Sequence, residues 1–153
     1  MEIKDSYELP LSKERVWAAL NDEEFLKRSI PWCEKLERCS ETELAAEVKL
    51  KIGPMSTRFT GCITLSDIDP PNGYTITGSG KGGIAGAASG SAKVKLLENK
   101  DASSTTLSYE VSAQVKGKIA QLGSRLIQST AKKLSKNFFG SFVKQLEDMD
   151  KPQ

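Results

Sequence analysis

The chain carries few of the side chains that catalyse reactions or hold metal ions. Histidine is absent, which removes the commonest general acid or base, the commonest metal ligand and any Ser–His or Cys–His nucleophile pair. The cysteines Cys33, Cys39 and Cys62 are odd in number and lack CxxC spacing, so we expect free or structural reduced thiols. We therefore predict no catalytic residue, no metal site and no required cofactor.

A glycine-rich run from Gly80 to Gly90 is the one stretch with the composition of a phosphate-binding loop. A P-loop needs Lys-Ser/Thr at the start of a helix after its last glycine, whereas Gly90 leads into an alternating, strand-like pattern. The pattern favours a glycine-loosened strand beside a cavity or a sharp bend. Gly86, Gly90 and Ala92 also remove side-chain volume, and apolar space of this kind suits a hydrophobic ligand.

The last stretch, from Lys116 to about Met149, is predicted to form one long helix. Its apolar residues recur at spacings of three or four with one gap of eight, at Ile119, Leu122, Leu126, Leu134, Phe138, Phe142 and Leu146. Such a helix is about 45 Å long and crosses the whole fold. Gly123 within it either lets a strand approach closely or leaves room for a ligand. Arg125 is predicted to be a surface charge, the alternative being a contact with a ligand oxygen or partner carboxylate at the pocket mouth.

The preceding residues predict one strand, two short helices and about six further strands. The helices are expected at 13–20 and 23–28, with Ser12 and Asp22 as N-caps. Alternation of apolar and polar residues predicts strands near 2–9, 43–52, 55–65, 74–79, 90–96 and 105–115. We expect an α+β fold in which a curved antiparallel sheet wraps around the terminal helix and the short helices close one end. At 153 residues the chain is expected to form a single domain, 1–153.

The inward phases of these elements predict a hydrophobic pocket. Its predicted ligand-binding residues are Trp32, Phe59, Ile63, Ile76, Ala92, Tyr109, Val111, Leu122, Gly123 and Leu126. Plain core packing is the alternative for most of them. Tyr109 stands out because a buried phenol hydroxyl needs a partner and could meet a ligand carbonyl. Trp32 lies at the corner between helices and sheet, where it could gate the pocket.

The charge and hydropathy patterns exclude other classes of protein. With 22 basic and 20 acidic residues and no basic face, the chain is not expected to bind nucleic acid. The N-terminus has no signal-peptide pattern. No run approaches the eighteen or so apolar residues of a membrane span. We therefore expect a cytoplasmic protein that does not cross a bilayer by itself.

Several motifs resemble those of a known family. They are Gly86-Ala-Ala-Ser-Gly-Ser-Ala-Lys-Val-Lys-Leu, Thr106-Leu-Ser-Tyr, Val115-Lys-Gly-Lys-Ile-Ala-Gln-Leu-Gly-Ser-Arg-Leu-Ile, Phe138-Phe139 with Phe142, Val16-Trp17, Asp22 and Ile30-Pro31. Together they resemble the carbon monoxide dehydrogenase G-subunit family, within the START-like (SRPBCC) helix-grip superfamily. The resemblance covers nearly the whole chain, and the Lys-Ile-Ala-Gln-Leu-Gly-Ser-Arg-Leu-Ile run is its most specific part.

The resemblance implies a carrier for an apolar small molecule, a quinone or similar lipid. In this family the ligand is proposed to be carried to a molybdenum-containing CO dehydrogenase-type enzyme, which is thereby linked to the membrane. A bound quinone or lipid, that enzyme complex as partner, and peripheral association with the inner face of the membrane are the corresponding expectations. Many relatives have a longer, membrane-attaching C-terminal extension, whereas this sequence ends at Lys151-Pro-Gln.

Two other functions stay open on the sequence. A cyclase or hydrolase of the same fold would need convergent acid and base groups, and Tyr109 is the one titratable side chain on the inward phases. An interaction module would use the lysine-rich face of the last helix and the polar outer sheet to dock on an acidic dehydrogenase subunit or an anionic membrane surface.

Overall fold

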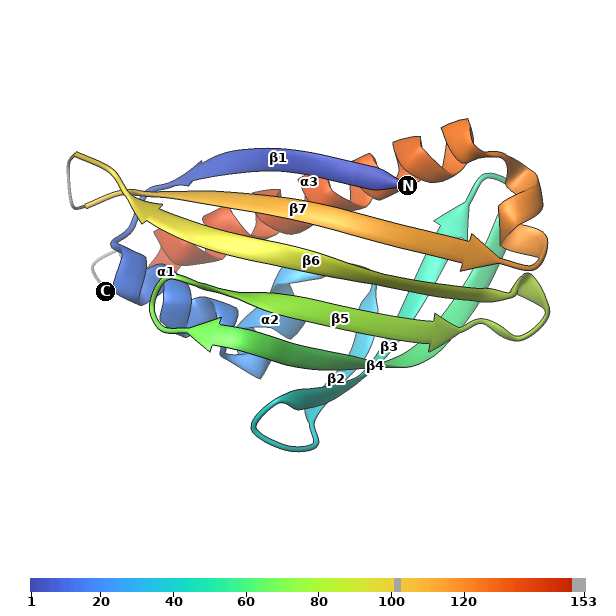
Figure 1. Ribbon diagram of the computed structural model, residues 1–153, viewed down its shortest axis with the longest axis horizontal. Helices are drawn as coiled ribbons and strands as arrows, with labels where there is room; N and C mark the ends of the chain where they lie inside the picture. Colours follow the sequence, from blue (N-terminus) through green and yellow to red (C-terminus); the bar gives the residue numbers. More distant parts are fainter. Residues whose placement is uncertain (101–102, 150–153) are drawn as a thin grey trace.

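The computed structural model describes residues 1–100 and 103–149 and shows a curved sheet wrapped around a long helix (Figure 1). In chain order the elements are β1 (Glu2–Leu9), α1 (Lys13–Leu20), α2 (Glu23–Ser29), β2 (Cys33–Arg38), β3 (Glu43–Ile52), β4 (Met55–Asp69), β5 (Gly73–Lys81), the 3₁₀ helix η1 (Gly83–Ala85), β6 (Ala87–Glu98), β7 (Thr105–Lys116), the 3₁₀ helix η2 (Lys118–Leu122) and α3 (Ser124–Met149). The predicted fold class is confirmed.

The strands form one antiparallel sheet in the order β1-β7-β6-β5-β4-β3-β2. Because side chains alternate between faces, paired residues lie on the same face. The register sets Ile76, Ala92 and Val111 side by side across β5, β6 and β7. The neighbouring row consists of Gly78, Gly90 and Ala113.

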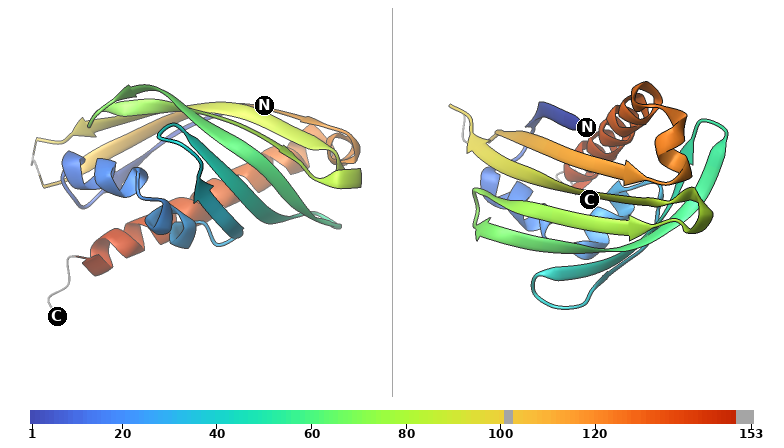
Figure 2. Two further views of the ribbon diagram at one scale, coloured as in Figure 1. Left: turned by 90° about the horizontal axis from the view of Figure 1, so that it is seen from below. Right: turned by 45° about the vertical axis from the view of Figure 1, so that its right-hand side comes forward.

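Helix α3 runs along the concave side of the sheet, and α1 and α2 close one end (Figure 2). Both short helices begin at the predicted caps. The Arg15 backbone N–H donates to Ser12 Oγ, and the backbone N–H groups of Glu24 and Phe25 donate to Asp22 Oδ1. Such caps each stabilise a helix by about 1 kcal/mol.

The last helix begins later than the sequence predicts, because two glycines interrupt it. Gly117 and Gly123 have φ of +88° and +96°, values that L side chains rarely adopt. Between them lies η2, so α3 starts at Ser124 and is about 39 Å long. A Cβ at Gly117 would lie 2.7 Å from Gly86 Cα. The placement of Gly123 inside a continuous helix was therefore wrong.

Two other segments are sharper than their sequence patterns indicate. The glycine-rich run forms a tight turn in which η1 joins β5 to β6, and Gly86 has φ of +116°. A Cβ there would collide with the Lys116 carbonyl. Strand β2 follows Trp32 and has Leu36 as its one buried residue, since it lies at the edge of the sheet.

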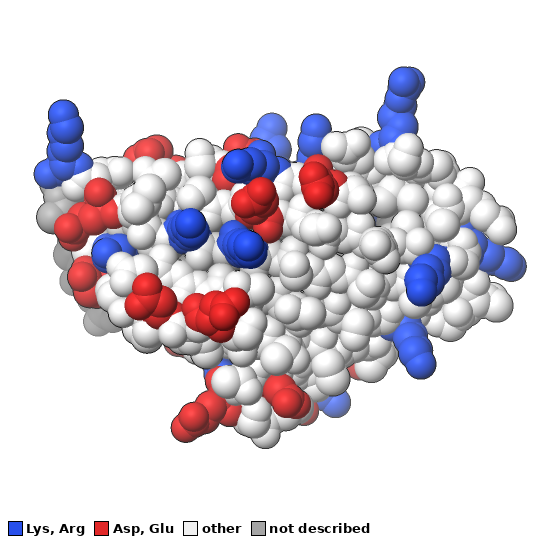
Figure 3. All heavy atoms as spheres, in the orientation of Figure 1, with Lys and Arg blue, Asp and Glu red and all other residues white. Residues whose placement is uncertain are grey.

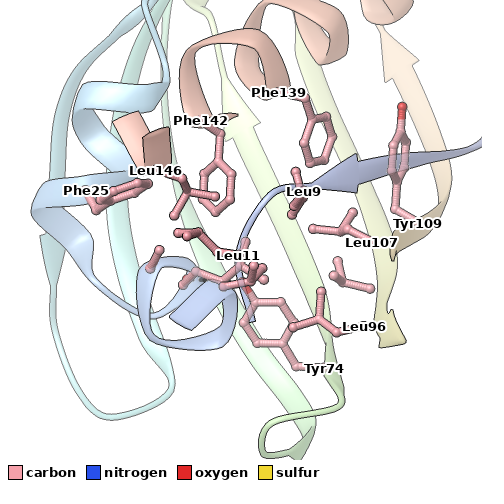
Figure 4. Packing of buried hydrophobic residues seen from close by; sticks show 14 of the residues in the cluster. Leu9, Leu11, Phe25, Tyr74, Leu96, Leu107, Tyr109, Phe139, Phe142 and Leu146 are labelled. Atoms are coloured by element: carbon pink, nitrogen blue, oxygen red, sulfur yellow. Dashed lines mark hydrogen bonds between the residues drawn. The ribbon is translucent and has the colours of Figure 1, made fainter. Parts of the chain in front are cut away.

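The buried side chains form two clusters at opposite ends of the molecule. The larger cluster includes Leu9, Leu96, Leu107, Phe142 and Leu146 beside α1 and α2 (Figure 4). The smaller cluster consists of Ile52, Phe59, Ala85 and Ile119, with partly buried neighbours. Between them the inward-facing residues of the central strands and α3 are only partly buried, as at Ile63, Ile76, Ala92, Val111, Ala131 and Leu134. The middle of the fold is therefore hollow.

Candidate functional site

The hollow consists of two apolar compartments between the sheet and α3. The helix-end compartment, about 370 Å³, lies beside α2 and includes Leu26, Trp32, Ile63, Tyr109 and Phe138 in its lining. The hairpin-end compartment, about 390 Å³, lies toward the β3–β4 hairpin and includes Val48, Leu50, Phe59, Val115 and Ile127. Each volume falls within the range of ordinary small-molecule sites.

The two compartments share a waist, which we define as Ile76, Ala92, Val111, Ala131 and Leu134. Small residues on both walls leave it open. On the sheet, Ala92 stands between Ile76 and Val111. The adjacent row of Gly78, Gly90 and Ala113 lines the hairpin-end compartment. The helix side is equally thin, because Ala131 faces the cavity where a larger side chain would fill it.

The charged and phenolic side chains around the helix-end compartment have partners in the protein. Arg38 donates to the carbonyls of Glu41 and Asn21. Tyr74 donates to the Leu20 carbonyl at 3.2 Å, and burial raises its pKa above the ordinary value. The pKa of Tyr7 is raised to about 12, first by burial and then by its hydrogen-bonded neighbour Tyr109. The phenols of Tyr7 and Tyr74 are therefore neutral at pH 7.

Aromatic rings form the floor of the same compartment. The Tyr109 and Phe139 rings stack at 5.3 Å between centroids, and the Tyr7 and Phe139 rings at 4.3 Å. Figure 4 shows Tyr109 and Phe139 facing each other from β7 and α3. Among the described residues no group of three or more His, Cys, Asp or Glu could hold a metal ion. The arrangement suits binding of an apolar molecule and offers no paired acid and base in the described lining.

Seven of the ten predicted pocket residues line this cavity. Trp32, Ile63 and Tyr109 line the helix-end compartment, Phe59 lines the hairpin-end compartment, and Ile76, Ala92 and Val111 belong to the waist. Three predicted contacts, Leu122, Gly123 and Leu126, line neither compartment. Leu122 and Leu126 pack against the smaller core cluster, and Gly123 is exposed. The Gly123 break accounts for this, since it ends the helical phase on which those predictions rested.

The prediction missed the residues that α3 contributes at the waist and beside it. Ala131, Leu134 and Ser135 all line the helix-end compartment. The signal was present in the sequence as the eight-residue gap in the apolar stripe between Leu126 and Leu134. That gap holds Thr130 and Ala131, so it marks where the helix faces open space. Arg125 is exposed, as expected of a surface charge.

The end of the molecule beyond the hairpin-end compartment is basic. The segments 48–66, 70–97 and 111–146 contain no Asp or Glu, and Figure 3 shows Lys and Arg without acidic neighbours at that end of the visible face. We call Lys81, Ile84, Lys116 and Lys118 the basic tip; all four residues are exposed, Ile84 to 85%. In the described part of the chain, no helix is long and apolar enough to span a bilayer.

Comparisons with known proteins agree with this architecture. The family model CoxG, which describes the G-subunit of carbon monoxide dehydrogenase, matches residues 6–147. A conserved protein from Geobacillus kaustophilus has 30% sequence identity and a TM-score of 0.90, with 97% of this chain and 96% of that chain covered. No curated protein matches the sequence.

More distant structures share the fold. The Zhui aromatase/cyclase from Streptomyces sp. R1128 has a TM-score of 0.71 at 13% identity, covering 96% of this chain and 93% of that chain. A START superfamily protein from Mycobacterium smegmatis has a TM-score of 0.64 at 17% identity, covering 95% and 98%. With a family match over nearly its whole length and a START-like fold around an apolar cavity, this chain belongs to the CoxG family of carbon monoxide dehydrogenase.

Proposed function

We propose that the protein is a non-catalytic carrier of one apolar small molecule, a respiratory quinone or a similar prenyl lipid, held between the sheet and α3. The observation that carries this proposal is the pair of apolar compartments joined at the waist. Their shape suits an elongated ligand whose ring occupies one compartment and whose chain occupies the other. In this role the protein supplies a molybdenum-containing CO dehydrogenase-type enzyme, in keeping with its family.

Burial of apolar surface supplies the affinity. A ligand that loses about 400 Å² of apolar surface to the cavity gains about 10 kcal/mol gross. Lost rotational and translational freedom offsets a large part of that gain. A net affinity in the micromolar range or tighter is the expected result. Carriage is favoured over a cyclase or hydrolase reaction because the charged and phenolic lining groups, Arg38, Tyr74 and Tyr109, have partners within the protein.

Titration calorimetry with a prenylated naphthoquinone tests this function. The wild-type protein should bind one molecule per chain. An Ala92→Trp variant should lose that binding because the new ring closes the waist, whereas Lys93→Trp, on the exposed face of the same strand, should keep it. Failure of the folded wild-type protein to bind, or equal binding by the Ala92→Trp variant, would remove the proposal.

We also propose that the ligand enters and leaves at an anionic membrane surface touched by the basic tip. Ile84 protrudes from the η1 turn, which packs against the β7–η2 junction through Gly86 and Gly117. An exposed isoleucine among lysines suits the lipid interface, where the apolar side chain inserts and the lysines meet anionic headgroups. Ala85, next to Ile84, packs with Phe59 and Ile119, which line the hairpin-end compartment. The tip therefore lies directly over that compartment.

Sedimentation with vesicles tests the membrane contact. Phosphatidylglycerol-rich vesicles should bind the wild-type protein, and pure phosphatidylcholine vesicles should bind it weakly. Ile84→Ser should weaken anionic-vesicle binding, and Lys81→Gln and Lys118→Gln should each weaken it about fivefold. Ile68→Ser is the matched control, since Ile68 is 41% exposed between Asp67 and Asp69. Equal loss in the Ile68 and Ile84 variants would argue against this surface.

A further inference from the structure

One buried hydrogen-bond donor at the cavity has no acceptor. The Trp32 ring lines the helix-end compartment. Its Nε1 is buried and, among the described residues, is the one buried side-chain nitrogen or oxygen without a hydrogen-bond partner. Native proteins leave such groups unpaired rarely, because each costs the fold free energy. An unpaired indole N–H in the wall of an apolar cavity therefore needs an explanation.

A second polar group of the same compartment is unengaged. Ser135 lines it from α3. Within the described chain, Ser135 Oγ makes no hydrogen bond, whereas Ser129 and Thr130 on the same helix both donate to the Leu126 carbonyl. Trp32 lies between α2 and β2, on a different wall from α3. Two unsatisfied groups thus face one compartment from separate elements.

The other polar groups of this compartment are already satisfied. Tyr74 donates to Leu20, Arg38 to Glu41 and Asn21, and Tyr109 is hydrogen-bonded to Tyr7. The contrast singles out Trp32 and Ser135 as groups whose partner is not part of the described chain. An indole N–H only donates, and a serine hydroxyl can also donate. The missing partner is therefore an acceptor oxygen on the ligand.

We infer that Trp32 and Ser135 form a headgroup subsite, in which Trp32 Nε1–H and the Ser135 hydroxyl donate to a carbonyl-type oxygen of the bound molecule. This inference rests on the proposed carrier function and adds an orientation to it. The oxygen-bearing ring lies in the helix-end compartment, and the hydrocarbon chain passes the waist toward the hairpin-end compartment. The ligand class is accordingly a ring carbonyl compound with an apolar tail, and a plain hydrocarbon of equal size is a poorer ligand.

A matched pair of ligands tests the subsite. The probes are 2-methyl-3-farnesyl-1,4-naphthoquinone and 2-methyl-3-farnesylnaphthalene, which differ only in the two carbonyl oxygens. Titration calorimetry should show that Trp32→Phe weakens binding of the quinone about three- to tenfold and leaves binding of the hydrocarbon within twofold. Ser135→Ala should weaken quinone binding about threefold. Trp17→Phe is the control, because Trp17 contacts Tyr74 at 5.1 Å between ring centroids and lies outside the cavity lining.

The outcomes separate the two proposals. Selective loss of quinone affinity in the Trp32→Phe variant supports the subsite. An equal loss for both ligands would show that Trp32 acts by ring packing, and no loss for either would show that its N–H is not used; both results overturn the inference while leaving the carrier function standing. If the folded wild-type protein binds neither ligand, the carrier function fails and the subsite fails with it.

Discussion

Replacement of Ala92 by leucine tests whether the waist is empty. Ala92 lies between Ile76 and Val111 in the sheet and faces both compartments. Leucine adds three carbon atoms at this position. If these atoms enter existing space, each buried carbon contributes about 0.8 kcal/mol, which sets an upper value of about 2 kcal/mol for the gain in the free energy of unfolding.

A closely packed interior gives the opposite sign. Adding the same atoms where no space exists costs about 1–3 kcal/mol through strained rotamers and backbone shifts. Ala19 supplies the comparison, because it is 6% exposed within the larger core cluster and lines neither compartment. Ala19→Leu should therefore destabilise the fold, whereas Ala92→Leu should not.

Urea unfolding of ligand-free protein, followed by circular dichroism, measures both changes. The midpoint should rise or stay unchanged for Ala92→Leu and fall for Ala19→Leu, with unchanged m-values in both. The Ala92→Leu protein should also bind a prenylated naphthoquinone less tightly, because its side chain occupies ligand space. If Ala92→Leu is destabilised as much as Ala19→Leu, the waist is filled in solution and the reasoning is refuted.

Three further predictions concern the frame around the cavity. Gly140→Ala should raise the free energy of unfolding by about 1 kcal/mol in chemical denaturation, since nothing lies near the added Cβ in α3, and Gly86→Ala should lower it by more than that because φ is +116°. Ser29→Ala should lower it by about 1–3 kcal/mol, because buried Ser29 donates to the Phe25 carbonyl and accepts from Gln145 Nε2 at 2.6 Å; Gln145→Ala, which removes the more exposed partner, should cost less. The pKa of Tyr7 is raised from 10.0 to about 12, so its contribution is complete below pH 10 and is lost as the pH rises toward 12; a Tyr7→Phe variant should show a shallower loss of stability across that range, and an equal slope would count against the shift.

Local signals in the sequence were sufficient for most of the fold. Alternation located the inward faces of β3 to β7, and the capping residues Ser12 and Asp22 marked the starts of α1 and α2. Strand β2 escaped because it lies at the sheet edge and buries only Leu36, so it lacks an alternating pattern. Edge strands are poorly marked for this reason.

Non-local contacts decided what the sequence could not. The break before α3 depends on φ at Gly117 and Gly123, and Gly117 is fixed by close packing on Gly86, which is 31 positions earlier in the chain. Helical periodicity carried the predicted contacts Leu122 and Leu126 through that break. The strand-borne residues Ile76, Ala92 and Val111 were placed correctly on the inward face because their phase comes from alternation alone.

The polar chemistry of the site depends on pairing in three dimensions. Tyr109 attracted attention in the sequence as a buried phenol, but its hydroxyl is hydrogen-bonded to Tyr7 on the neighbouring strand. Trp32 was noted only for its place at the corner after Pro31. That its Nε1 lacks an acceptor follows from the packing of α2, β2 and α3 around it, which periodicity does not describe.

The most direct test is organic extraction of the protein purified from the cells that make it, followed by mass spectrometry of the extract against the amount of chain. We expect close to one molecule of a ring carbonyl compound with a prenyl tail for each chain, and a large reduction in the Ala92→Trp variant purified in the same way. An extract without such a compound, from protein that also fails to take up a prenylated naphthoquinone after refolding, would contradict the proposal that the hollow between the sheet and α3 carries an apolar ligand.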